Sequence, residues 1–133
     1  MFSKVLHSKI HRATVTQADL HYEGSITVPP HLLKTAGIHE YEAVNVWNVT
    51  QGTRFETYAI SGKPDSNDIC VNGAAAHRVT PGDLVIIACF QYVESKELSK
   101  HKPTLVFVDE NNEIVDIREE VPGPEEPPRL YRV

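Results

Sequence analysis

The chain has 133 residues, a length that suits one domain built around a single hydrophobic core. Hydrophobic residues make up 41% and charged residues 23%, close to an average soluble protein, which excludes a disordered or fibrous chain. The net charge of −5 argues against a general nucleic-acid binder, because binding to phosphates needs clustered lysine and arginine.

Short runs of alternating apolar residues, separated by turn residues, predict a mainly β chain. The expected strands cover residues 4–16, 26–28, 41–49, 54–60, 69–72, 84–93 and 104–108. Short helices are expected at Pro30–Ala36, Ala74–Val79 and Glu94–Lys100. The longest apolar run, Leu84–Phe90, is too short to span a bilayer, so we expect a cytoplasmic protein with no membrane partner.

A faint internal repeat joins two of these regions. Residues 26–46 and 69–87 each read as a strand, a short helix, a glycine (Gly37 or Gly82), an acidic residue and a second strand. Two such units can close on each other and remove exposed sheet edges, which favours a small barrel of interleaved halves.

The barrel domain is expected to cover residues 1–120. Residues 121–133 are rich in proline and glutamate, so we expect a flexible acidic tail to which no chemistry is assigned. Cys70 and Cys89 lack CxxC spacing and are interpreted as small buried thiols in a reducing compartment.

The residues around Gly24-Ser25 are candidates for chemistry, although a bare Gly-Ser pair is also an ordinary turn. Lys9 and His11 share one face of the first strand, because side chains two positions apart point the same way. Arg54, Glu56 and Tyr58 share a face of another strand. Thr57 faces the opposite way there, so it can join the same site only through a bulge or a subunit boundary.

No metal site is expected. His7 and His11 have a spacing that suits a helix, but on a strand they would lie ~13 Å apart and could not bind one ion. The sequence also lacks paired CxxC motifs, glycine-rich phosphate loops and a G-x-S-x-G nucleophile elbow.

Five segments taken together resemble the bacterial aspartate 1-decarboxylase family: Lys9–Ala13, Val15–Ser25, Val46–Val49, Thr57–Ile60 and Val71–His77. The longest match within them is Ala-Asp-Leu-His-Tyr-Glu-Gly-Ser at residues 18–25. The resemblance spans residues 1–93 and fades beyond Lys96.

This resemblance implies a double-psi β-barrel with short helices, assembled as a homotetramer with active sites between subunits. It implies a zymogen that undergoes autocatalytic cleavage between Gly24 and Ser25, alone or with a maturation factor, and converts Ser25 into a pyruvoyl group. The implied reaction is decarboxylation of L-aspartate to β-alanine through a Schiff base, for pantothenate and coenzyme A biosynthesis. The pyruvoyl group would serve as the electron sink, so no external cofactor is expected.

The resemblance also assigns roles to residues. Ser25 and Tyr58 are the catalytic pair, with Tyr58 as the acid that reprotonates the decarboxylated substrate. Processing is assigned to Gly24, Ser25 and Thr57. The substrate-binding set consists of Lys9, His11, Arg54, Thr57, Asn72, Gly73, Ala74 and Ala75. For Arg54 and Lys9 the charge of a substrate with two carboxylates supports the same role.

A second hypothesis belongs to another class of protein. Residues 28–37, followed by Glu42-Ala-Val44, resemble the half-barrel motif of swapped-hairpin transcription regulators that bind DNA. Such a regulator needs a basic face, whereas this chain is acidic and its cationic residues are scattered.

Overall fold

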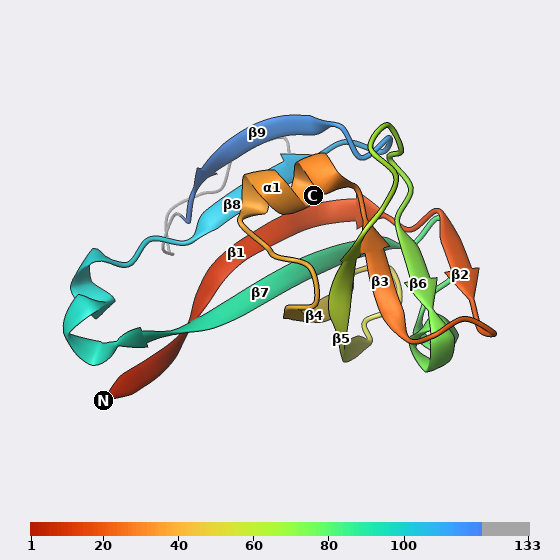
Figure 1. Cartoon of the computed structure of the whole chain (residues 1–133). Coiled ribbons are helices and arrows are strands. Elements are labelled where there is room, and N and C mark those ends of the chain that lie inside the picture. The colour runs from red at the N-terminus through yellow and green to blue at the C-terminus, as the bar shows by residue number, and fades with distance from the viewer. Residues whose placement is uncertain (121–133) are drawn as a thin grey trace.

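The computed structural model describes residues 1–120, which form a nine-stranded, strongly curved sheet with short helices (Figure 1). The order of its strands is β2-β6-β3-β5-β4-β7-β1-β8-β9. The prediction of a mainly β fold with short helices is therefore confirmed. The elements are β1 (Phe2–Thr14), β2 (Gln17–Asp19), β3 (Ser25–Val28), α1 (Pro30–Ala36), β4 (Ala43–Asn48), β5 (Arg54–Ser61), β6 (Cys70–Asn72), η1 (Gly73–Arg78), β7 (Leu84–Glu94), η2 (Ser95–Lys100), β8 (Thr104–Val108) and β9 (Ile114–Glu119).

One face of the curved sheet encloses the hydrophobic core. Along β4, for example, alternate residues are buried, as the period of a pleated strand requires. Ile10, Ile26, Val44, Val46 and Ile87 are among the core residues with no exposed surface. Helix α1 packs Leu32, Leu33 and Ala36 into the same core and lies across β1 and β8 (Figure 1).

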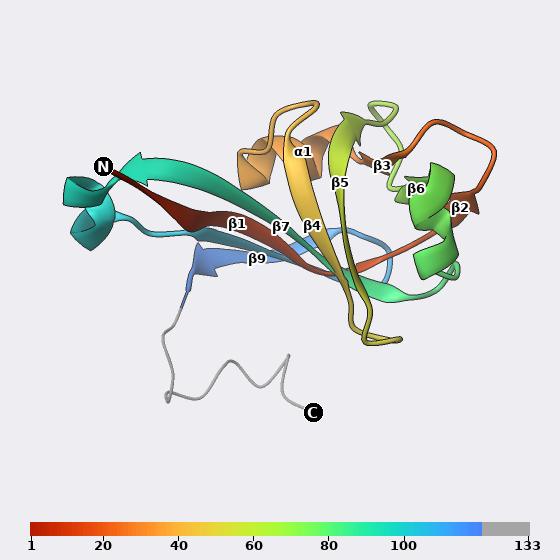
Figure 2. The same cartoon turned by 90° about the horizontal axis from the view of Figure 1, so that it is seen from below.

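The internal repeat predicted from the sequence is present in the structure. The unit β3–α1–β4 corresponds to β6–η1–β7, and the turn glycines Gly37 and Gly82 both have positive φ. Strand β3 pairs with β6, and β4 pairs with β7, each antiparallel. The two units therefore interleave. Figure 2 shows η1 beside β6 and β2 at one end of the molecule, and η2 at the other end with the N-terminus.

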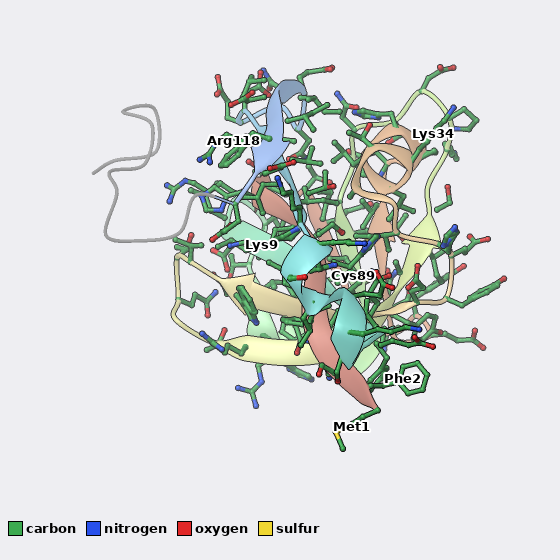
Figure 3. All side chains as sticks on the ribbon, turned by 90° about the vertical axis from the view of Figure 1, so that its left-hand side faces the viewer. Met1, Phe2, Lys9, Lys34, Cys89 and Arg118 are labelled. Carbon is green, nitrogen blue, oxygen red and sulfur yellow. The ribbon has the colours of Figure 1, made fainter. Side chains whose placement is uncertain are left out.

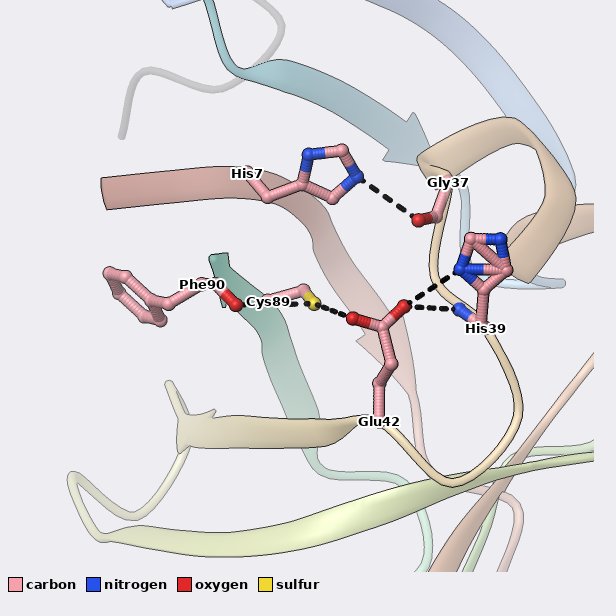
Figure 4. Close-up of polar contacts among 6 residues, drawn as sticks. All are labelled: His7, Gly37, His39, Glu42, Cys89 and Phe90. Carbon is pink, nitrogen blue, oxygen red and sulfur yellow. Dashed lines mark hydrogen bonds and ion pairs between the residues drawn. The ribbon is translucent and has the colours of Figure 1, made fainter. Parts of the chain in front are cut away.

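The end of α1 is tied to the neighbouring strands by polar contacts (Figure 4). Gly37 adopts a left-handed conformation with φ of 70°, and its carbonyl lies 3.0 Å from Nε2 of His7 on β1. The Glu42 carboxylate accepts hydrogen bonds from the backbone N–H of His39, at 2.7 Å, and from the Cys89 thiol, at 3.7 Å. Burial and this carboxylate raise the pKa of Cys89 to about 12, so the thiol stays protonated.

Strands β2 and β9 were not predicted from the sequence, and they are the two edges of the sheet. Hydrogen bonds of Asn112 join loops near the ends of these two strands. The Asn112 side chain bonds the backbone of Thr14 at 2.7 and 3.0 Å and the carbonyl of Asn67 at 2.9 Å. Asn112 thus links the β8–β9 turn to the end of β1 and to the loop before β6.

Two further predictions concern membrane-spanning segments and the C-terminal tail. None of the helices within residues 1–120 has the length and hydrophobicity needed to cross a membrane. The tail predicted at residues 121–133 lies outside the described residues.

Candidate active site

Ser25 is the first residue of β3 and is completely buried. It lies opposite Asn72 in the antiparallel pairing of β3 with β6. The side-chain amide of Asn72 donates a hydrogen bond to Ser25 Oγ at 3.0 Å and another to Thr27 Oγ1 at 3.2 Å. A serine hydroxyl is therefore held in a water-poor position next to a fixed N–H donor, directly after the exposed Gly24.

Gly73 packs directly against Gly24. Its φ is +71°, and a Cβ added there would lie 2.6 Å from Gly24 Cα and 2.7 Å from Gly24 N. Such a side chain would also meet the Tyr22 carbonyl at 3.0 Å. Glycine is required at position 73 both for its backbone conformation and for this close approach.

Tyr58 is next to Ser25 across the sheet. Strands β3 and β5 are parallel with Ile26 opposite Ala59, so the preceding residues Ser25 and Tyr58 fall side by side. Ile26 and Ala59 point into the core, and Ser25 and Tyr58 share the other face. Tyr58 is 36% exposed, so its hydroxyl can meet a ligand from solvent.

Arg54 lies on the same face of β5 as Tyr58, four residues earlier and thus ~13 Å away along the strand. Its guanidinium stacks over the Trp47 ring at 5.0 Å. Together they line a cavity of about 310 Å³ with Lys4, Asn45 and Phe90. Trp47 therefore holds the planar group of Arg54 in a defined orientation.

Lys9 and His11 lie on β1, three strands from β5 in the sheet. Lys9 Nζ lies 3.6 Å from the Glu120 carboxylate. The His11 ring packs edge-on against Phe107, with 5.2 Å between centroids. Burial, and then the positive charges of Lys9, Arg12 and Arg118, lower the pKa of His11 to about 4. Lys9 and Arg118 are labelled in Figure 3.

Thr57 faces away from Tyr58. The pairing of β4 with β5 runs from Ala43 opposite Tyr58 to Trp47 opposite Arg54 without a register shift, which excludes the bulge considered from the sequence. The remaining sequence-based explanation for a shared site is a subunit boundary. Two further predicted residues, Ala74 and Ala75, follow Gly73, the first residue of η1. Ala74 is exposed and Ala75 is half-buried against the core.

Cys70, which lies on β6 two positions before Asn72, was not among the residues predicted for the site. Cys70 was interpreted as a small buried residue, but it is only half-buried. Its thiol donates a hydrogen bond to Asn72 Oδ1 at 3.0 Å. Cys70, Thr27, Ile60 and Asn72 help to line a cavity of about 570 Å³ on the face that carries Ser25. The alternation of Cys70 and Asn72 along a strand was the available signal.

The structure thus brings Gly24, Ser25, Tyr58, Asn72 and Gly73 together within one chain. It places Arg54, Lys9 and His11 elsewhere on the sheet. Among residues 1–120, no three histidine, cysteine or acidic side chains gather closely enough to hold a metal ion.

The chain matches the aspartate decarboxylase family model over residues 1–115. It is 66% identical to an aspartate 1-decarboxylase of Legionella pneumophila (strain Lens) over 119 residues, covering 90% of each protein. It is 58% identical to an aspartate 1-decarboxylase of Rhodopirellula baltica, covering 92% of this chain and 79% of that protein. For an aspartate 1-decarboxylase of Myxococcus xanthus the identity is 60%, over 89% of this chain and 92% of the relative.

These matches are to an enzyme family and not to the swapped-hairpin transcription regulators. They extend past Lys96, where the resemblance of short segments faded, and reach the β9 strand. The predicted resemblance and the predicted class of enzyme are both confirmed. The chain belongs to the aspartate decarboxylase family.

Proposed function

We propose that this chain decarboxylates L-aspartate to β-alanine and carbon dioxide after cutting its own backbone between Gly24 and Ser25. The product would serve pantothenate and coenzyme A biosynthesis in the cytoplasm. The printed names of the relatives support the substrate. The observation that carries the mechanism is the buried Ser25 Oγ, which receives an N–H from Asn72 while Gly73 packs on Gly24.

The processing chemistry begins at Ser25. Its hydroxyl oxygen attacks the Gly24 carbonyl carbon, and the amide becomes an ester that joins Gly24 to the serine side chain. Attack creates an oxyanion, which needs preorganised hydrogen-bond donors. The reaction also requires a peptide that is held in position and cannot move away from the nucleophile. Contact with Gly73 restricts Gly24 in this way.

Elimination then removes the Cα proton of residue 25 and breaks its Cβ–Oγ bond. The electron pair of that bond stays on Oγ, which becomes part of the Gly24 carboxylate. Residue 25 is left as dehydroalanine, which hydrolyses to a pyruvoyl group and ammonia. The buried position next to the Asn72 amide fits this small group, because it offers one N–H donor and excludes bulk water.

When formed, the pyruvoyl group supplies a carbonyl that takes up the electron pair released as carbon dioxide leaves. Tyr58, which lies beside it across the sheet, would deliver a proton from its hydroxyl to the decarboxylated carbon. Aspartate carries two carboxylates, and Arg54 offers a planar guanidinium that can bind one of them through two N–H groups. Lys9 and neutral His11 provide further polar contacts.

A homotetramer with shared sites would explain why these residues are spread over one chain. The backbone of Arg54 lies ~13 Å from that of Tyr58 along β5, and Lys9 lies three strands from β5 in the sheet. Thr57 faces the opposite side of β5 from Tyr58. A neighbouring subunit that presents its Arg54, Lys9 and Thr57 to this Ser25 would complete the site.

Intact mass of the denatured protein tests the proposal. We expect separate chains of residues 1–24 and 25–133, and borohydride reduction with aspartate should add substrate mass to the larger chain alone. Ser25→Ala should remain one chain with no decarboxylase activity. Ser8→Ala is the matched control, because Ser8 is equally buried but lies in the core of β1. Decarboxylation by intact, unmodified protein would disprove the mechanism.

A further inference from the structure

Asn72 has a carboxamide with two chemically different ends, and both ends are engaged. Its N–H group donates to Ser25 Oγ and Thr27 Oγ1. Its carbonyl oxygen accepts the hydrogen bond of the Cys70 thiol at 3.0 Å. The two hydroxyls can each donate or accept, so they would tolerate either orientation of the amide. Of these three contacts, the thiol distinguishes the two orientations most clearly, because a thiol is a poor acceptor.

The thiol can perform this role only while it carries its proton. Burial, and then the negative charges of Asp19 and Asp68, raise the pKa of Cys70 above its ordinary value. The sulfur therefore stays a neutral S–H donor. A rotated Asn72 would place an N–H against the sulfur and its carbonyl oxygen against Ser25 Oγ.

We propose that Cys70 is a positioning residue for self-processing: its S–H fixes the Asn72 carboxamide so that the amide N–H faces Ser25 Oγ. This inference rests on the proposed cleavage before Ser25. It adds a residue to that chemistry which acts through Asn72 and touches neither the reacting atoms nor the substrate.

The orientation matters most in the elimination step. As the Cβ–Oγ bond of residue 25 breaks, its electron pair passes to Oγ, and negative charge develops on that oxygen. An N–H that already points at Oγ stabilises this charge, whereas an amide carbonyl in its place would repel it. Formation of the ester depends less on the amide, because Oγ enters that step as a neutral hydroxyl oxygen. Loss of the Cys70 donor should therefore make the ester accumulate.

The test uses Cys70→Ala, which has no donor, and Cys70→Ser, whose hydroxyl can donate to the amide oxygen or accept from the amide N–H and so no longer selects one orientation. Newly made full-length chain is followed in pulse-labelled bacteria by intact mass, with and without hydroxylamine, a nucleophile that cuts esters and spares amides. We expect about twofold slower formation of the final 25–133 chain in Cys70→Ala, because without the thiol the two orientations of the amide become about equally populated. We also expect hydroxylamine to cut that variant between residues 24 and 25. Cys70→Ser should show a similar slowing and the same hydroxylamine-sensitive ester, because its hydroxyl tolerates both orientations of the amide.

Cys89→Ala is the matched control, since this other thiol bonds Glu42 and not Asn72. It should process normally. Wild-type speed in Cys70→Ala would overturn the inference, and so would slowing in Cys70→Ala without a hydroxylamine-sensitive ester, which would indicate a general effect on packing. If the wild-type chain itself never separates into residues 1–24 and 25–133, the proposed function fails first, and the two failures are distinguishable.

Discussion

Replacing Gly73 by alanine should have two effects, a cost in backbone conformation and a steric clash with Gly24. Any alanine at φ near +70° costs about 1–2 kcal/mol of folding free energy relative to glycine. At Gly73 the new Cβ would also lie 2.6 Å from Gly24 Cα, whereas ordinary contacts begin near 3.4 Å. Because the obstacle is backbone, Gly24 or Gly73 must move by about 0.8 Å, the difference between these distances.

Gly52 is the matched control for this substitution. Its φ is +76°, yet an added Cβ would meet nothing within 4 Å. Gly52→Ala should carry only the conformational cost, with a melting temperature lower by about 4–8 °C and normal cleavage. A misplacement near 1 Å between reacting groups costs roughly 100-fold in rate, so Gly73→Ala should cleave about 100 times more slowly.

The assay is a time course of intact mass on freshly made chain, combined with thermal melting of each variant. The circular dichroism of Gly73→Ala must show a folded sheet for the comparison to count as a test of positioning. Wild-type cleavage in folded Gly73→Ala would refute the role of this contact. Equal slowing in Gly52→Ala would instead attribute the effect to general destabilisation.

Three further outcomes are expected. Arg54→Ala should be cleaved normally but lose about 100-fold in kcat/KM, since a charged clamp on a substrate carboxylate is lost; normal kinetics would contradict that role. Tyr58→Phe should also be cleaved, with kcat lower by about 100-fold because a general acid is missing, and an unchanged kcat would move the acid elsewhere. Unfolding takes up a proton at His11 between its ordinary pKa of 6.5 and its folded value of about 4, so stability should fall as pH drops through this window. Thermal melting of His11→Gln should show a weaker loss, and an identical pH profile would assign the loss to other groups.

Most of the local structure follows from patterns within short stretches of chain. The helix predicted at Pro30–Ala36 was correct at both ends, because proline suits the first turn and Gly37 adopts the left-handed conformation that stops it. Strands with one buried face were also found. The edge strands β2 and β9 were missed, because β2 has only three residues and most side chains of β9 are exposed. Their stability comes from pairing with β6 and β8, which no local pattern records.

The candidate site was predictable as a set of residues but not as an arrangement. Spacing along β5 correctly placed Thr57 opposite to Tyr58. The neighbourhood of Ser25 and Tyr58 depends on the parallel register of β3 with β5, a pairing between segments about 30 residues apart that composition does not specify. Cys70 was missed because its role depends on which end of the Asn72 amide it meets.

The place of β1 in the sheet has a consequence for the proposed two-chain product. This strand is interior, paired with β7 on one side and with β8 on the other, and it belongs to the segment that cleavage before Ser25 would detach. The short chain would stay bound by those hydrogen bonds and by buried residues such as Ile10. Once denatured, however, two separate molecules must find each other again, so refolding would become second order in concentration. A precursor should recover from denaturant readily, and the mature protein only when both pieces are abundant.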